Sequence, residues 1–466
     1  MYASSRSPFF SVYLLLGFLA ALSACTVFAP PERSVQPVEL PADFAWDTNG
    51  TAPIDHWWRK FDSRELNSLV HAALEDNFNI RSSWAKLRQA KAVAAKSRAG
   101  LFPALDTSLE GSRSRSYRDY EMLSDTKSAS LDLAASYEVD LWGRIRAGYT
   151  ADRLSARAAY EDLRTTAISL TGEVVKAWVE LLAARRQIQV VQDQIDVNER
   201  LLRIQVSRFE KGMASALDLT QQKELVAGSR SALPPLRARQ RAALNQLALL
   251  LGRADSGSLS IRGQSLPPPI PQPEAGVPAD LLMARPDVRA AFYRLRSADW
   301  AVSVARIDRL PVLSISARTA LSSDSFSLAW GDWLTRLGSS LTAPVFDAGS
   351  RQAEVERSRA VSDERLAEYA GTVLEAVKEV QDALANIAGY KEQIARVEDE
   401  LRAAEQAREQ ARIRYINGQN DYLNFVTQQR SVHELQRSLV SARADLLASQ
   451  IALYRALGAG EGWDRG

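Results

Sequence analysis

Apolar residues recur at spacings of three and four along two very long segments, residues 143–211 and 349–416. Examples from the first segment are Val174, Val175, Trp178, Leu181 and Leu182, and examples from the second are Val373, Leu374, Val377, Val380 and Leu384. This spacing is typical of a helix that buries one face. We therefore predict two long α-helices over these segments.

The distribution of proline supports the two long helices. The chain has no proline between Pro103 and Pro234 and none after Pro344, and a proline inside a helix costs about 3 kcal/mol. At about 1.5 Å per residue, each helix would extend roughly 100 Å. Such lengths favour coiled-coil packing, although a helical bundle with ordinary cores would show the same spacing.

The hydrophobic period changes to two after Pro103 and after Pro311, which predicts four strands at residues 102–117, 128–141, 311–322 and 328–346. In the second strand Leu131, Leu133, Tyr137, Val139 and Leu141 alternate with polar residues that include Asp132, Glu138 and Asp140. In the third, Leu313 and Ile315 alternate with Ser314, Ser316 and Arg318. Polar loops are expected at 118–126 and 322–325. Alternation over about ten residues is typical of outer-membrane strands, and a water-soluble hairpin would give the same pattern.

Four strands are too few to form a closed wall in a membrane. Every backbone N–H group in lipid needs a partner, and small barrels begin at about eight strands. If these strands cross a membrane, several copies of the chain must share one barrel.

The two halves of the chain repeat each other. Gly143, Gly212 and Gly252 are followed 206 residues later by Gly349, Gly418 and Gly458. This order of landmarks indicates a tandem duplication, with one repeat at residues 64–262 and the other at 279–458. A proline-rich linker, residues 263–278, separates them. Gly212 and Gly418 suit left-handed helix ends, after which helices at 217–251 and 421–457 would run back.

The N-terminus has the features of a secretory leader, with Arg6 before a short apolar stretch. A short core helix is the alternative. The stretch ends in Leu-Ser-Ala-Cys, which resembles a bacterial lipobox, so we expect a signal peptide at 1–24 and a lipid on Cys25, the single cysteine. The next residue is Thr26 and not the Asp that is associated with retention in the inner membrane, and this resemblance points to the outer membrane. Residues 25–63 would then be a lipid-anchored segment, and residues 459–466 a C-terminal tail.

Composition offers little evidence of catalysis. The net charge of +2 gives no nucleic-acid signal. His56, His71 and His433 share no metal-ligand spacing, so we interpret them as surface or packing residues. We find no phosphate-binding glycine loop and no nucleophile elbow. We therefore expect a protein that is not an enzyme and has no cofactor apart from the covalent lipid.

The chain resembles a known family, the TolC-like outer-membrane efflux channels of the lipoprotein type. The resemblance rests on Cys25 and on the segments HWWRKFDSRELNSLV, ALEDNFNI, LFPAL, YEVDLWGR, RYINGQNDYLNFVTQQ and APVFDAGSR. It implies a mainly α fold with a transmembrane β-barrel, in which a homotrimer forms a twelve-stranded barrel and a periplasmic helical tunnel. It also implies two partners, a periplasmic adaptor and an inner-membrane transporter.

The resemblance places the periplasmic entrance at the helix reversals, residues 208–219 and 414–427. The residues expected there are Arg208, Gly212, Leu217, Asp218, Arg414, Gly418, Asp421, Leu423, Asn424 and Thr427. Asn424 and Thr427 stand where related proteins often have aspartates, so Leu423, Asn424 and Thr427 are expected to close the entrance. Asp218 would otherwise be a helix N-cap. Arg208 and Arg414 would either bridge carboxylates or complement helix dipoles.

The expected function is a passive conduit that exports small molecules, with energy supplied by the partner pump. Asp132, Glu138, Asp140 and Arg318 would line the barrel lumen. Two alternatives stay open. One is the outer-membrane component of a one-step protein-secretion system, and the other is a lipid-anchored coiled-coil scaffold without a pore.

Overall fold

The computed structural model describes residues 28–31, 33, 36–43, 56–257, 259–273, 278–280, 285–323 and 333–459. The predicted signal peptide, Cys25, residues 460–466 of the predicted tail and residues 328–332 of the predicted fourth strand lie outside these ranges. The chain divides into two compact units that interleave along the sequence. Unit 1 comprises Met1–Pro37, Ala85–Tyr160 and Ala290–Ala370, and unit 2 comprises Val38–Trp84, Glu161–Arg289 and Gly371–Gly466. Each repeat therefore contributes to both units.

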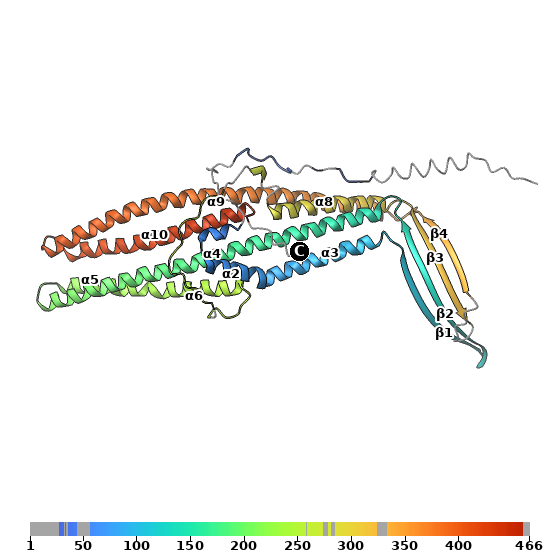
Figure 1. Ribbon diagram of the computed structural model, residues 1–466, viewed down its shortest axis with the longest axis horizontal. Coiled ribbons are helices and arrows are strands. Elements are labelled where there is room, and N and C mark those ends of the chain that lie inside the picture. The colour runs from blue at the N-terminus through green and yellow to red at the C-terminus, as the bar shows by residue number, and fades with distance from the viewer. Residues whose placement is uncertain are drawn as a thin grey trace, which may run out of the picture. The chain divides into compact units, whose positions relative to one another are not determined.

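Unit 1 contains a four-stranded antiparallel sheet in the order β1-β2-β3-β4 (Figure 1). Its strands are β1 (Ala104–Arg118), β2 (Glu121–Val139), β3 (Val312–Ser323) and β4 (Trp333–Thr342). Trp142, just after β2, donates its indole N–H to the carbonyl of Pro311, just before β3, at 2.7 Å. This bond joins the two repeats at one end of the sheet.

The helices that lead into and out of the sheet are α3 (Phe78–Ala99), α4 (Arg144–Glu210), α8 (Pro286–Ile307) and α9 (Ser350–Ile416). Both α4 and α9 have 67 residues, and each lies within one residue of the helix expected from the apolar spacing. Among the described residues, no helix combines the length and the apolar character that a membrane crossing needs.

The predicted boundaries of the strands need three corrections. The predicted loop at 118–126 is mostly strand, because the chain reverses in two residues, Asp119 (φ 48°) and Tyr120 (φ 70°). Positive φ at both central residues gives a turn whose twist matches the flanking strands. β2 ends at Val139 rather than at 141. β4 ends at Thr342 rather than at 346, and Pro344 in the predicted extension lacks the N–H that a strand needs.

Unit 2 is helical. Besides its parts of the long helices, it contains η2 (Trp57–Phe61), α2 (Arg64–Asp76), α5 (Ala216–Ser231), α6 (Leu233–Leu250), η3 (Pro278–Asp280) and α10 (Tyr422–Ala456). The predicted single helix at 217–251 is thus two helices separated at Ala232. The reason is that Pro234 and Pro235, in the first turn of α6, have no N–H to continue the hydrogen-bond ladder of α5.

The core of unit 2 forms around aromatic residues of η2. Trp57 is fully buried and its ring stacks on Tyr454 of α10 with centroids 5.1 Å apart. Leu66, Val174, Leu181 and Leu247 belong to the same cluster. Full burial of such a side chain contributes roughly 1.5–3 kcal/mol, so this cluster ties the segment before the first repeat to both repeats.

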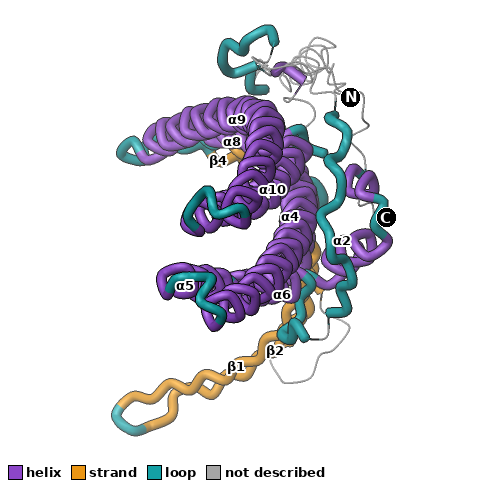
Figure 2. The backbone as a smooth tube through the Cα atoms, turned by 90° about the vertical axis from the view of Figure 1, so that its left-hand side faces the viewer, coloured by secondary structure: helices purple, strands orange, loops and turns teal. Residues whose placement is uncertain are grey.

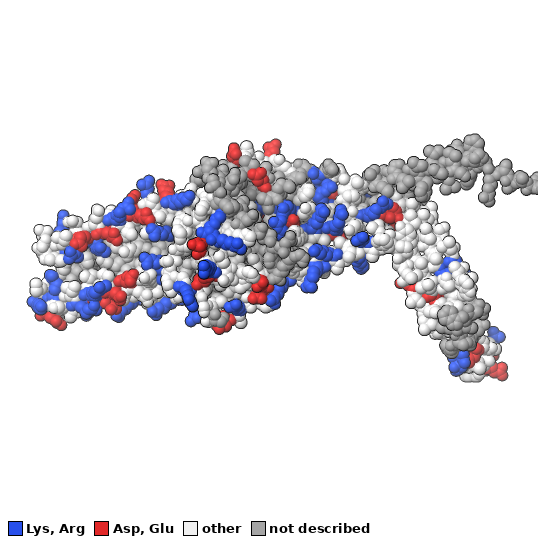
Figure 3. Space-filling view, in the orientation of Figure 1, with Lys and Arg blue, Asp and Glu red and all other residues white. Residues whose placement is uncertain are grey.

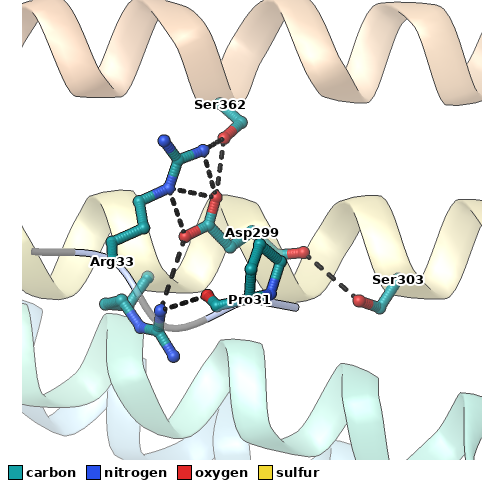
Figure 4. A network of polar contacts seen from close by, with 6 residues as sticks. Pro31, Arg33, Asp299, Ser303 and Ser362 are labelled. Atoms are coloured by element: carbon teal, nitrogen blue, oxygen red, sulfur yellow. Dashed lines mark hydrogen bonds and ion pairs between the residues drawn. The ribbon is translucent and has the colours of Figure 1, made fainter. Parts of the chain in front are cut away.

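In unit 1 the N-terminal segment is held against α8 and α9 by a polar cluster (Figure 4). Arg33 donates to both carboxylate oxygens of Asp299 and to the hydroxyl of Ser362. Arg296 donates to the carbonyl of Pro31 at 2.9 Å. The segment that follows the predicted lipidation site is therefore attached to specific positions on the helices.

Candidate functional site

The register of the sheet separates apolar from polar side chains. Leu109 pairs with Leu131, Leu131 with Leu321, and Leu321 with Trp333. Four apolar residues thus lie in one row across all four strands. Leu105, Leu133, Ile315, Leu337 and Leu341 belong to the same face and are exposed in the single chain. Such a face of large exposed apolar side chains suits contact with lipid.

The opposite face of the sheet is polar. Its side chains include those of Ser108, Asp132, Ser136, Ser314, Ser316 and Arg318. Arg318 donates to Asp132 at 2.8 Å, and Asp132 is only 5 % exposed. The pair neutralises both charges across the β2–β3 boundary. Asp132 and Arg318, predicted as lumen residues, are therefore brought together by the register.

Glu138 and Asp140 are placed differently. Glu138 lies on the same face as Asp132 and forms an ion pair with Arg144 at 2.8 Å. Asp140 lies beyond the end of β2, and its carboxylate accepts the N–H groups of Ile145 and Arg146 at 3.0 Å each. A carboxylate at these orphan donors stabilises the start of α4. Asp140 is thus a helix-capping residue at the junction and not a residue of the strand.

The helix reversals in unit 2 have the same backbone geometry in both repeats. Gly212 and Gly418 have φ values of 70° and 68°. The residue after each glycine donates its N–H to the carbonyl five positions earlier, from Met213 to Arg208 at 2.7 Å and from Gln419 to Arg414 at 2.8 Å. These are the bonds of a Schellman C-cap. Figure 2 shows the two turns at the ends of the α4–α5 and α9–α10 hairpins.

The helices that follow the turns start differently. Ser215, not Asp218, is the N-cap of α5: the Ser215 hydroxyl accepts the Asp218 N–H at 3.1 Å, and the Asp218 carboxylate accepts the Ser215 N–H at 3.2 Å. The predicted capping role of Asp218 is corrected to the third helical position of a capping box. Asp421 is the N-cap of α10 but accepts no capping bond through its side chain.

Residues expected to close the entrance share an exposed face of α10. Leu423, Asn424 and Thr427 are all exposed, and the Thr427 hydroxyl donates to the Leu423 carbonyl at 2.9 Å. Leu217 of α5, the repeat equivalent of Leu423, is 65 % exposed. Each hairpin therefore presents one unpartnered leucine near its turn, and Asn424 is the equivalent of Asp218.

Arg208 stabilises the first turn without a carboxylate. Its guanidinium donates to the Met213 carbonyl at 3.3 Å and lies over the Tyr415 ring, 5.0 Å from the centroid. This contact favours interaction with the carbonyl end of α4 over a carboxylate bridge. Arg414 is exposed at the second turn.

A buried polar contact between the two hairpins was not predicted from the sequence. Tyr422 is 2 % exposed and donates its hydroxyl to Gln222 at 2.6 Å. Burial raises the pKa of Tyr422 to about 12, so the hydroxyl keeps its proton. Gln205 donates to the Tyr415 hydroxyl at 3.1 Å. These residues could have been noticed in the sequence, because they are polar residues at positions where the apolar spacing predicts buried side chains.

Repeat-equivalent residues also meet at this contact. Arg430 of α10 donates to Glu224 of α5 at 2.7 Å, and the two positions differ by the repeat offset of 206. A residue contacts its own equivalent only near a local axis that relates the repeats. The two hairpins are therefore packed as a near-symmetric pair, held by these polar contacts and by an apolar cluster that includes Leu225 and Phe425.

Comparison with known proteins identifies the family. The family model described as outer membrane efflux protein matches residues 69–253 and 277–459, one match for each repeat. The pyoverdine export outer membrane protein OpmQ of Pseudomonas aeruginosa is 32 % identical, with 96 % of this chain and 98 % of that protein covered. Outer membrane protein OprJ of the same species is 30 % identical over 99 % of this chain and 98 % of that protein.

Structural comparison agrees with the sequence relatives. The solved structure of the outer-membrane channel OprN matches with a TM-score of 0.85 and 26 % identity. The match covers 93 % of this chain and 99 % of that chain. The duplicated helices and the four-stranded sheet are thus those of TolC-like outer-membrane channels. The chain belongs to the outer membrane efflux protein family, and it is an outer-membrane channel subunit of an efflux system.

Proposed function

We propose that three copies of the chain complete one barrel and form a passive conduit for small molecules. The observation that carries this proposal is the four-stranded sheet, in which β1 and β4 are both edge strands with no further strand paired to them among the described residues. An open edge is not tolerated in lipid, so the edge of β4 must pair with β1 of a neighbouring copy. The family resemblance supports three as the number of copies.

The test is the oligomeric state and conductance of the full-length protein. Native mass spectrometry in detergent should give a mass of three chains, and planar bilayers should show discrete conductance steps. A monomeric sample without conductance would leave only the scaffold interpretation. A conducting assembly of another size would contradict the number three but not the shared wall.

The conduit is proposed to work with a periplasmic adaptor and an inner-membrane transporter. The polar contacts between the two hairpins, Tyr422 with Gln222 and Arg430 with Glu224, support a tip that changes between closed and open arrangements. An adaptor with higher affinity for the open arrangement would shift this equilibrium. Crosslinked pull-down from intact cells should recover both partners, whereas recovery of a protein-secretion transporter would favour one-step secretion.

We also propose that Cys25 carries the lipid that anchors the N-terminal segment. The support is the sequence Leu-Ser-Ala-Cys after an apolar stretch, together with the attachment of Arg33 to α8. Metabolic labelling with a fatty acid should mark the wild type and should be lost in Cys25→Ser. Labelling that persists in this variant would rule out Cys25 as the modified residue. No catalytic activity and no dissociable cofactor are assigned to this function.

A further inference from the structure

The β1–β2 hairpin extends beyond the described parts of β3 and β4. Among the described residues, which leave out 324–332, pairing between β2 and β3 reaches Ala129 with Ser323, whereas pairing between β1 and β2 continues to Arg118 with Glu121. Residues 112–128 pair only with each other in the part of the chain that the structure describes, and we call them the β1–β2 ribbon. Figure 3 shows charged side chains gathered at the far end of this hairpin, with a largely uncharged stretch of sheet before them.

The two faces of the ribbon differ in chemistry. One face consists of hydroxyl side chains, namely Ser112, Ser114, Ser116, Ser124, Thr126 and Ser128, and the Ser112 and Ser128 hydroxyls lie 2.9 Å apart. The other face carries Arg113 opposite Lys127 and Arg115 opposite Asp125. Strand alternation keeps these sets apart, so Arg113, Arg115 and Lys127 lie on one side, whereas Arg118 beside the turn lies on the hydroxyl side.

The basic face continues the apolar face of the sheet. Leu109 and Leu131 form a cross-strand pair on that face, the small residues Gly111 and Ala129 form the next pair, and Arg113 and Lys127 follow. Arg113 is four positions after Leu109, which is about 13 Å along a strand. The row of Leu109 also contains Trp333 of β4, a residue type that gathers where hydrocarbon meets headgroups. The basic residues therefore lie at headgroup level and on the lipid side.

The cluster keeps an excess of positive charge and exposed donors. Asp125 lies 2.5 Å from the guanidinium of Arg113 and 3.4 Å from that of Arg115. One carboxylate thus faces three basic residues, which leaves two positive charges. The two arginine side chains are 42 % and 43 % exposed, and a planar guanidinium has N–H groups suited to phosphate oxygens. The Tyr117 side chain, 58 % exposed, lies on the same face.

We propose that this face of the β1–β2 ribbon binds phosphate groups carried by lipid headgroups of the outer leaflet, with Arg113, Arg115 and Lys127 as the ligands. The site holds the barrel wall to the surrounding glycolipid and keeps the hydroxyl face of the ribbon turned away from it. The inference depends on the sheet facing lipid and not on the number of copies in the barrel.

The test titrates the full-length protein in detergent with fluorescent lipopolysaccharide. Near an anionic membrane surface each basic residue contributes about 1 kcal/mol, so Arg113→Ser with Arg115→Ser should weaken binding about thirtyfold. Asp125→Asn should strengthen binding, because it removes the negative charge between the arginines. Arg118→Ser is the matched control: it removes one positive charge from the hydroxyl face of the same ribbon and should leave binding unchanged.

Two further binding measurements identify the ligand. Lipopolysaccharide whose phosphates have been removed should bind the wild type as weakly as the intact lipid binds the double variant, and inorganic phosphate should compete poorly. Unchanged binding by the double variant, weaker binding by Asp125→Asn, or full displacement by inorganic phosphate would each overturn the proposal. Unaltered conductance of the double variant in planar bilayers would exclude misfolding as the cause of weak binding.

Discussion

Arg33 in the N-terminal segment and Asp299 on α8 form an ion pair that involves both carboxylate oxygens. The Arg33 Nε atom lies 3.0 and 2.9 Å from these two oxygens. Asp299 is 5 % exposed, whereas the Arg33 side chain is 27 % exposed. The two partners therefore differ in what the loss of the other would cost. The carboxylate would remain buried, but the guanidinium could turn toward water.

This asymmetry predicts the order of stability among three variants. Arg33→Gln should lower the free energy of unfolding by about 1–3 kcal/mol, because the buried carboxylate loses its main donor and keeps only the Ser362 hydroxyl and Arg296 at 3.9 Å. Asp299→Asn should cost less, and the double variant should be more stable than Arg33→Gln alone. Thermal unfolding of the purified protein measures all three. Glu364→Gln, an exposed acid near Ser362 on α9, is the control and should be neutral.

The same ion pair is predicted to protect the chain from trypsin, which cleaves after arginine. With its side chain bound to Asp299, Arg33 is not available to the protease, so Asp299→Asn should expose the bond between Arg33 and Ser34. Mass spectrometry of the fragments after brief digestion would detect a new N-terminus at Ser34. Equal cleavage in the wild type and in the variant would show that the segment is not held in this way.

The buried hydroxyl of Tyr422 is predicted to keep the two hairpins together. Tyr422→Phe removes the donor to Gln222 and leaves a buried acceptor unpaired, which costs about 1–3 kcal/mol. The closed tip should therefore be populated less, and single-channel recordings should show a larger mean conductance. Thr220→Val, at an exposed position of α5 whose hydroxyl bonds only within its own helix, should leave the conductance as in the wild type.

Gly418 is predicted to be required at the second turn because its φ is 68°. Gly418→Ala places a side chain in the left-handed region, which should destabilise the protein by about 1 kcal/mol. Gly389 is also glycine but lies inside α9 with open space around it. Gly389→Ala should therefore stabilise by roughly 0.5–1 kcal/mol. Chemical denaturation curves would reveal opposite signs, and equal effects would contradict the proposed role of the turn.

His433 is predicted to make the stability of unit 2 depend on pH. It is 6 % exposed, its ring Nε2 lies 2.5 Å from the Gln429 amide nitrogen, and burial lowers its pKa from 6.5 to about 4. The unfolded chain binds a proton below about pH 6.5, whereas the folded chain does so only near 4. Stability is therefore fully present above pH 6.5 and falls by about 3 kcal/mol as the pH drops to 4.

The measurement for His433 is the unfolding midpoint between pH 4 and 7, the range set by its two pKa values. His433→Gln should flatten this pH dependence, since glutamine does not titrate. His71→Gln is the control, because the His71 side chain is 73 % exposed and its removal should leave the slope unchanged. A slope in His433→Gln as steep as in the wild type would assign the effect to other groups.

Much of the architecture was predictable because it depends on local patterns. The 3.6-residue period and the absence of proline predicted both 67-residue helices to within one residue at each end. The repeat offset predicted that Gly212 and Gly418 would end them in the same way, which their φ values confirm. Alternation predicted the apolar and polar faces of the strands. Local geometry is enough for these features, because helix ends and strand faces are decided by residues close in the chain.

The pairings between distant residues came only from the tertiary structure. Nothing in the sequence places Arg33 beside Asp299, Gln222 beside Tyr422 or Arg318 beside Asp132, since these contacts join segments 186 to 266 residues apart. The capping role of Asp140 also needed the structure, because it depends on where β2 stops.

The amino-acid sequence by itself determined the elements, their duplication and the chemistry of each face, because these follow from short-range periodicity and backbone preference. The tertiary structure decided which faces meet and in what register. A one-residue slip between strands would move Arg113, Arg115 and Lys127 to the other side, and only packing over the whole chain selects among such registers.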